Sequence, residues 1–399
     1  MTVEMVKPVG VEATAQALPP RRFFTPTFWM SAGYWWYFGA MGCYFPYLAL
    51  YYRQLGLTGG QIGLLVALPP LAVALLAPLW GMLADWLGIH RLVLRLSLVP
   101  AAGFAVLLAR ANNFTSILWV AALLAIVLAP AMPLLDSYAL AIGERQRVNY
   151  GQMRFWGSLG FTVGVWGIGW WMGAAITPAF LVAYAGCLLL TAVVTLGLPP
   201  LALHTTRLNR AMLAATLRQP TLLVLLLATY MVSIAFSIMG NFFSIYLAEL
   251  GAIHLIGLAN VLLAVSEMPV MLAGNWLLNR FGARRLLAVA ILVYALRLFV
   301  YSSLTGPTWL LPAQLLSPFS YTLFLLSSIR LAAQVGKREL AATAQGLLAA
   351  AAALGSITGA LSGGLLLDQI GIFAVYRLAA WVALLTLGVY VVGMRRYGR

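Results

Sequence analysis

Apolar runs of about 20 residues recur from one end of the chain to the other, and each is long enough to cross a bilayer as an α-helix. Short polar stretches separate these runs. The pattern therefore predicts an all-α membrane protein with twelve transmembrane helices. They are expected at residues 28–52, 60–84, 91–110, 113–139, 152–173, 178–198, 221–249, 253–279, 284–304, 308–332, 340–369 and 371–394.

The longest polar interruption, residues 199–220, divides the predicted helices six and six. The sequence thus predicts two six-helix bundles, residues 28–198 and residues 221–394, joined by a central loop. A tail over residues 1–27 precedes the first bundle, and a short tail over residues 395–399 follows the second.

A short repeat relates the two predicted bundles. GMLADWLGIHRL at residues 81–92 aligns with NWLLNRFGARRL at residues 275–286 at a constant offset. Parallel repeats of six helices are an architecture of transporters, so we expect the bundles to be pseudo-symmetric. The aligned pairs are Asp85 with Asn279, Gly88 with Gly282, and Arg91 with Arg285.

Lysine and arginine are concentrated in the loops on one side of the predicted helices. That side includes both termini and the central loop, whereas the other side holds only Arg53, Arg110 and Arg377. Cytoplasmic loops carry the excess of Lys and Arg in membrane proteins. We therefore expect a multi-pass protein of the inner (plasma) membrane, with both termini in the cytoplasm. The same bias explains the net charge of +15, which does not indicate a nucleic-acid partner.

The composition fits a membrane protein and disfavours an enzyme. The chain is 63% hydrophobic and 8% charged, with a mean hydropathy of +0.95, whereas soluble domains average about 25% charged residues. It contains no G-x-x-x-x-G-K-[ST] loop, no H-E-x-x-H motif and no histidines at zinc-ligand spacing. We expect no cofactor and no metal.

Four charged residues fall deep within the predicted helices. Asp136 lies near the end of one helix and Arg154 near the start of the next, while the second bundle contains Glu267 and Arg297. A charge at this depth costs roughly 2.5–3.5 kcal/mol on insertion scales, and such residues pair with one another or face a water-filled cavity. We expect them to bind a solute or couple an ion. The alternative is a structural role, as an ion pair or, for Arg297, as a cap for carbonyl groups.

Aromatic residues crowd the first predicted helix, beginning with YWWYF at residues 34–38. Tyrosine and tryptophan commonly form belts at the membrane interface, which is one interpretation of this cluster. The other is a cavity lining, for which Tyr37 and Tyr44 are the candidates.

The stretch at residues 81–91 resembles the G-x-x-x-D-x-x-G-x-x-R signature of the major facilitator superfamily, with Asp85, Gly88 and Arg91 in register. In that family the loop between helices 2 and 3 is a conformational latch between the two halves at the cytoplasmic face. Glycine permits a tight turn, and an aspartate there can bond a helix end or an arginine. The resemblance implies a latch role for these three residues.

Within the superfamily, the chain is similar to the lactose permease and phenylpropionate permease branch over nearly its whole length. The likeness is carried by GCYFPYLALY in the first helix, by YGQMRFWGSLGF around Arg154, and by the spacing from Asp136 to Arg154. It implies that Asp136, Arg154 and Arg297 bind the solute. It also places Phe161 where the permease stacks a tryptophan on its sugar.

The chain departs from this branch in its ionisable residues. The permease has a His and a Glu in helix 10 that serve proton coupling, and Ser317 and Ser320 stand in their place. Only Asp136 and Glu267 then remain deep enough to carry a proton. Arg154 beside Asp136 favours the ionised carboxylate, whereas burial favours the neutral acid at Glu267. Glu267 is therefore the expected proton carrier, with Asp136 as the second coupling residue.

These features predict a secondary transporter that moves a small organic solute by alternating access and proton-coupled symport. Sugars, nucleosides and aromatic acids all remain open as solutes. The alternatives are proton-driven efflux of drugs or metabolites, and an uncoupled facilitator. A membrane enzyme lacks a plausible metal or nucleophile constellation here, and a receptor needs no six-helix repeat. We expect a monomer whose partners are the solute, protons and membrane lipid.

Overall fold

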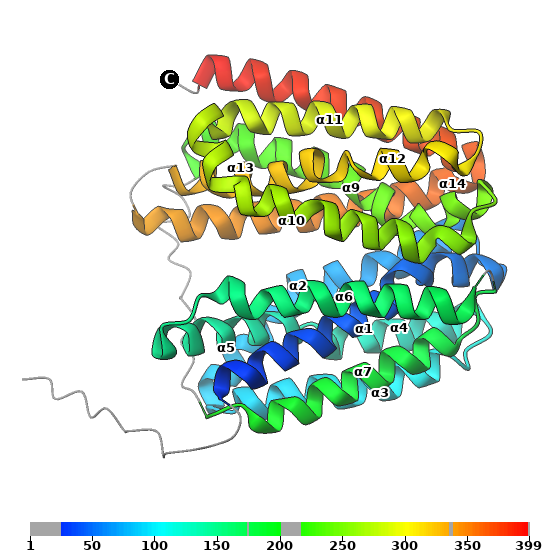
Figure 1. Cartoon of the computed structure of the whole chain (residues 1–399), viewed down its shortest axis with the longest axis vertical. Coiled ribbons are helices and arrows are strands. Elements are labelled where there is room, and N and C mark those ends of the chain that lie inside the picture. Colours follow the sequence, from blue (N-terminus) through cyan, green and yellow to red (C-terminus); the bar gives the residue numbers. More distant parts are fainter. Residues whose placement is uncertain (1–24, 174, 201–216, 335–337, 398–399) are drawn as a thin grey trace, which may run out of the picture.

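The structure, a computed structural model, is helical over nearly all the residues that it describes, and no strand occurs among them (Figure 1). Most of the predicted tail 1–27 and of the central loop 199–220 lies outside the described residues, as do the last two residues of the tail 395–399. The described residues are 25–173, 175–200, 217–334 and 338–397.

Six crossings form the N-terminal half. Two of its helices begin at threonine caps, since the Thr25 hydroxyl accepts a hydrogen bond from the Phe28 N–H and Thr58 forms a capping box with Gln61. The helices are α1 (Pro26–Gln54), α2 (Gly59–Leu87), α3 (His90–Leu108), α4 (Phe114–Leu128) with α5 (Ala131–Gln146), α6 (Tyr150–Met172), and α7 (Ala179–Val194) with η1 (Thr195–Gly197).

The C-terminal half repeats this arrangement, and Figure 1 shows the two halves as separate bundles of helices. Its last helix turns at Gly371, where a φ of 72° lies in the left-handed region that favours glycine. The elements are α9 (Pro220–Glu249), η2 (Ile253–Leu255) with α10 (Ile256–Phe281), α11 (Ala283–Ser303), η3 (Pro307–Trp309), α12 (Leu310–Gln314), η4 (Pro318–Thr322), α13 (Leu323–Gln334), and α14 (Arg338–Tyr397).

Twelve crossings account for these elements. Within the described residues, nine helical stretches are long and apolar enough to span a membrane by themselves. The stretch in α14 supplies two crossings, one on each side of Gly371. Helices α1 and α6 complete the set, and their many tyrosines, tryptophans and glycines explain why they are less apolar. The predicted fold class, two pseudo-symmetric six-helix bundles, is confirmed.

Two predicted helices differ from the structure in ways that matter for the site. The fourth, expected over 113–139, breaks around Pro130 and continues to Gln146, where Arg147 adopts a left-handed φ of 55°. The tenth, expected as one helix over 308–332, is divided into η3, α12, the π-helical turn η4 and α13. Proline has no N–H to donate, so a helix interrupted at such a residue must rearrange its hydrogen bonds.

The two halves contact each other where α1 ends and α2 begins, which we name the α1–α2 end. Gly59 and Gly63 of α2 pack directly on the backbone of Gly364 and Ala360 in α14, with no room for a Cβ atom. Farther from this end, α2 is no longer packed in this way. The exposed side chains there include Leu75, Leu79, Met82 and Trp86.

An ion pair reinforces this contact. Arg53 Nη1 at the end of α1 lies 2.7 Å from Asp368 Oδ1 on α14. The backbone N–H of Gly59 donates to the other oxygen of Asp368, so the carboxylate also caps the first turn of α2. Nearby, Gly169 of α6 packs on Gly257 of α10. The N-terminal and C-terminal halves are thus joined at the α1–α2 end.

Candidate functional site

Asp136 joins three helices of the N-terminal half. It lies half-buried on α5 and accepts two hydrogen bonds on one carboxylate oxygen, from the Tyr34 hydroxyl of α1 at 2.6 Å and from the Tyr150 hydroxyl of α6 at 2.9 Å. The two tyrosine rings meet edge to face, with their centroids 6.3 Å apart. Both hydroxyls donate, so Asp136 acts as the acceptor that ties α1 and α6 to α5.

Arg154 on α6 lies against aromatic faces. Its guanidinium carbon is 3.7 Å from the centroid of the Phe38 ring and 5.6 Å from that of Tyr34. Gly157 makes room for this arrangement, because a Cβ atom there would lie 2.8 Å from both Arg154 Nη1 and a Phe38 ring carbon. A cation–π contact uses the ring face and occupies none of the guanidinium N–H donors. In the described part of the chain, Arg154 and Asp136 form no direct ion pair; both contact Tyr34 instead.

The other candidates in this half divide into two groups. Tyr37 is buried and lies within electrostatic range of both Asp136 and Arg154. Phe161 is half-buried on α6, two turns beyond Arg154. Tyr44 lies in the core of the half, where its ring stacks on Tyr184 of α7 with centroids 4.4 Å apart. The structure therefore groups Tyr44 with the core packing rather than with the two charges.

Arg297 is enclosed in the C-terminal half, with 1% of its surface exposed. Its Nε donates to the Tyr301 hydroxyl at 3.3 Å, and its two terminal nitrogens donate to Ser320 Oγ and to Gln314 Oε1. Gln314 ends α12 and Ser320 lies in η4, so Arg297 connects α11 to the interrupted tenth crossing. This position favours the structural alternative for Arg297, although its partners are side-chain oxygens rather than backbone carbonyl groups.

Glu267 on α10 is half-buried and bonded to the same interrupted crossing. Ser317 Oγ donates to Glu267 Oε1 at 3.0 Å. Ser320 Oγ in turn donates to the Ser317 carbonyl at 2.9 Å and receives the bond from Arg297. Glu267 and Arg297 are thus connected through two serines. These are the serines that stand where the resembling permease has its coupling residues.

Tyr321 connects the two halves electrostatically. It lies on η4, 43% exposed, within electrostatic range of Glu267 in its own half and of Arg154 in the other. Tyr321 is therefore within electrostatic reach of a charged group from each half.

Sequence analysis missed four aromatic residues of this arrangement: Tyr34, Phe38, Tyr150 and Tyr321. A signal for the first three was present, because Tyr34 with Phe38 and Tyr150 with Arg154 are each four residues apart and so share a helix face. Because an interfacial belt also explains the aromatic residues 34–38, this shared helix face was not used to select Tyr34 and Phe38.

The predicted latch residues contact their own half. His90 Nε2 lies 2.7 Å from Asp85 Oδ1, and Arg91 donates to the Leu196 carbonyl after α7 at 3.1 Å. Gly88 ends α2 with a φ of 66°, the left-handed conformation that lets the chain reverse into α3. These contacts fix the α2–α3 turn against η1 at the end of the molecule opposite to the α1–α2 end.

Comparisons with known proteins agree with this architecture. A model of the MFS_1-like family matches residues 27–378. The chain is 32% identical to a maltose permease of Geobacillus stearothermophilus over 316 residues, which cover 78% of this chain and 80% of the relative. It is 27% identical to the uncharacterized transporter YwbF of Bacillus subtilis (strain 168) over 321 residues, 79% of each chain.

Two solved structures share the fold. The nucleoside transporter NupG superposes with a TM-score of 0.83 over 93% of this chain and 100% of that one, at 15% identity. An auto-inhibited POT family peptide transporter superposes with a TM-score of 0.72 over 93% of this chain and 97% of that one, at 13% identity. At such low identities, the likeness concerns the fold alone.

Proposed function

Because the chain belongs to the MFS_1-like family of major facilitator superfamily transporters, we propose that it is a secondary transporter for a small hydroxyl-rich solute. It moves this solute by alternating access, in symport with protons. The observation that carries the proposal is the Asp136–Arg154 group, in which tyrosine hydroxyls hold Asp136 while Arg154 lies on ring faces and keeps its N–H donors for a ligand.

The chemistry of this group suits a sugar. A carboxylate accepts hydrogen bonds from sugar hydroxyls, a guanidinium donates to pairs of oxygens, and aromatic faces pack against the apolar side of a sugar ring. The likeness to a protein named maltose permease, at 32% identity, supports this solute class. Nucleosides, which also carry a ribose, are the second candidate, supported by the Phe38 and Phe161 rings as stacking partners for a base.

Alternating access requires that the two ends of the molecule open in turn. Contacts between the halves at the α1–α2 end, with the Lys and Arg bias, support a state closed to the outside and open to the cytoplasm. In this proposal the termini and residues 199–220 are cytoplasmic, and the bundles 28–198 and 221–394 rock about the central site. The Asp85, Gly88 and Arg91 turn then acts at the cytoplasmic end.

Glu267 is the proposed proton carrier. It takes up a proton when the site faces outward and releases the same proton to the cytoplasm after the halves have rocked. Its bond from Ser317 is one that both the acid and the carboxylate can accept, so the side chain keeps its position through the cycle. Asp136, which accepts from two tyrosines, stays an acceptor for the solute.

A panel of sugars and nucleosides tested on purified protein in vesicles checks the proposal. A proton gradient should drive uphill accumulation of at least one of them. Solute-driven proton movement in the opposite direction would identify efflux, and equilibration without accumulation would identify an uncoupled facilitator. If no hydroxyl-rich solute moves while aromatic acids do, the assignment of the solute class is wrong.

A further inference from the structure

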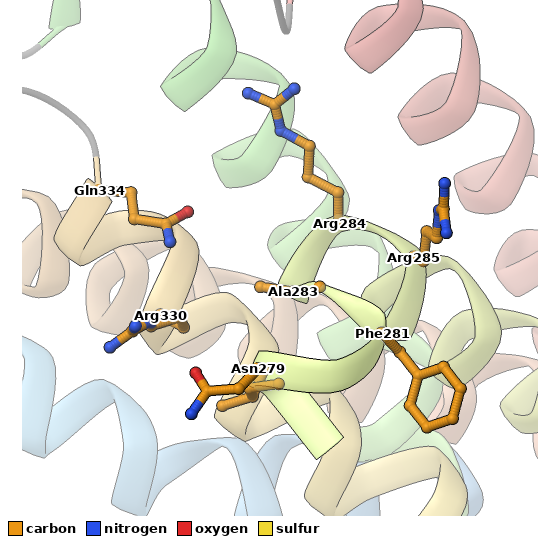
Figure 2. A pocket seen from close by; sticks show the side chains of 9 residues that line it. Asn279, Phe281, Ala283, Arg284, Arg285, Arg330 and Gln334 are labelled. Carbon is orange, nitrogen blue, oxygen red and sulfur yellow. The ribbon is translucent and has the colours of Figure 1, made fainter. Parts of the chain in front are cut away.

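A cavity of about 540 Å³ lies away from the charged groups described above, where the α10–α11 turn meets the last turns of α13. Arg284 and Arg285 extend from the start of α11, while Arg330 and Gln334 extend from α13 on the other side (Figure 2). We name this cavity the α10–α11 recess. Its lining residues are Leu278, Asn279, Phe281, Gly282, Ala283, Arg284, Arg285, Arg330 and Gln334.

The recess is the repeat counterpart of the α2–α3 turn, and the two differ in charge. In the first half, Asp85 provides a carboxylate that pairs with His90. In the second half, Asn279 stands in the place of Asp85 and Arg284 in the place of His90. The described residues that line the recess therefore carry three arginines and no acid.

The backbone of the recess adds to this positive potential. Helix α11 begins at Ala283, and its N-cap is Gly282, which offers no side chain to bond the first amide groups. The N–H groups at a helix start and the positive end of the helix dipole favour an anion. Arginines together with the amides at a helix start form a site for a phosphate group.

We propose that the α10–α11 recess binds the phosphate headgroup of an anionic phospholipid. This inference goes beyond the transported solute and rests only on the proposed orientation, which puts the recess at the cytoplasmic membrane surface. Basic pockets between helices on that side are the kind that hold acidic headgroups.

Neighbouring aromatic side chains favour a lipid over a soluble phosphate. Phe281 lines the recess and is 47% exposed, and its ring meets that of Trp276, which is 63% exposed, edge to face at 6.1 Å. Exposed aromatic rings beside a basic site at the membrane surface offer packing for the acyl chain. A free phosphate would gain nothing from them.

Lipid binding to the purified full-length protein, measured by native mass spectrometry, tests the proposal without any solute or gradient. The probes are phosphatidylglycerol and phosphatidylcholine with identical acyl chains. The wild type should bind the first more tightly. Arg330→Gln should weaken phosphatidylglycerol binding about fivefold, the effect of one basic residue near an acidic membrane surface. Asn279→Asp places in the recess the carboxylate that Asp85 provides in the first half. This variant should weaken phosphatidylglycerol binding at least as much as Arg330→Gln.

Arg91→Gln is the matched control, because it removes one arginine from the corresponding turn of the first half. It should leave phosphatidylglycerol binding unchanged. Equal affinity for the two lipids, an equal loss in Arg91→Gln, or displacement of the lipid by inorganic phosphate at the same concentration would each overturn the proposal. Thermal unfolding in phosphatidylcholine shows that the variants are folded. A protein that transports none of the tested solutes would still bind the lipid, so the two proposals fail independently.

Discussion

The two halves of the molecule each contain one deep carboxylate and one deep arginine, but they surround the arginines differently. In the N-terminal half, Arg154 lies on the faces of Phe38 and Tyr34, which take up none of its hydrogen-bond donors. In the C-terminal half, all three nitrogens of Arg297 have side-chain oxygens as partners. The same residue type is therefore available to a ligand in one half and satisfied within the protein in the other.

The two carboxylates also differ, in the number of hydrogen bonds that each receives. Asp136 receives two tyrosine hydroxyls on one oxygen, which hold the side chain between α1 and α6. Glu267 receives one hydroxyl, from Ser317, and has no arginine within ion-pair distance among the described residues. The N-terminal half thus contains the groups proposed to bind the solute, and the C-terminal half contains the group proposed to carry the proton.

Replacing each carboxylate by its amide gives the largest expected difference. Glu267→Gln should abolish uphill accumulation and its dependence on pH while preserving solute exchange, because glutamine mimics the protonated acid and still accepts the bond from Ser317. Counterflow and gradient-driven uptake in the same vesicles measure the two activities.

Asp136→Asn is the matched change in the other half. It removes the charged acceptor from the binding group, so exchange and accumulation should fall together. Gradient-driven concentration of solute by the Glu267→Gln protein would show that Glu267 is not the carrier.

Conservative replacement of the arginines is expected to have the next largest effect. Arg154→Lys keeps the charge but loses the planar fork that grips two oxygens, so solute affinity should fall at least tenfold, or about 1.4 kcal/mol. Isothermal titration of the purified protein measures this. Unchanged affinity would leave Arg154 with a structural role only.

Arg297→Lys should act on stability instead. A lysine cannot remake all the bonds to Tyr301, Gln314 and Ser320, and each lost bond to a charged group costs about 1.5–3 kcal/mol. Thermal unfolding should shift to lower temperature, while the folded fraction keeps its solute affinity. A tenfold loss of solute affinity with an unchanged unfolding temperature would instead assign Arg297 to the solute-binding site.

The sequence was sufficient for the fold but not for this distinction. Apolar runs specify the crossings because each must satisfy its own backbone inside the membrane, and the repeat identified the turns at Gly88 and Gly282. The roles of the two arginines depend on side chains from other elements, such as Phe38 and Gln314, whose proximity no local pattern encodes. The ion pair of Arg53 with Asp368 joins residues 315 positions apart and became apparent only in the structure.

That ion pair allows a smaller test of how the halves separate. Asp368→Asn removes the charge that pairs with Arg53 and caps α2 across the interface. Both side chains are more than one third exposed, so we expect about 1 kcal/mol at most, or a fivefold shift toward the state open at the α1–α2 end. Spin-label distances between the start of α2, near Gly59, and the middle of α14, near Asp368, report the shift, and Asp368→Glu is the control that keeps the charge. A distance distribution that is the same in all three proteins would assign the closure to the glycine contacts alone.

The smallest effect is expected at the turn between α2 and α3. Asp85→Asn keeps an acceptor for His90 but removes the negative charge that the resemblance assigns to the latch. Because Asp85 is 24% exposed at the side chain, the lost charge is worth about 0–1 kcal/mol. Transport should slow about two- to threefold while solute affinity stays the same, since the turn contacts His90 and η1 rather than Arg154. Turnover measured at saturating solute, beside equilibrium binding, separates the two quantities. A large loss of affinity in a folded protein would show that this turn communicates with the binding group, and the separation of latch from site would then be wrong.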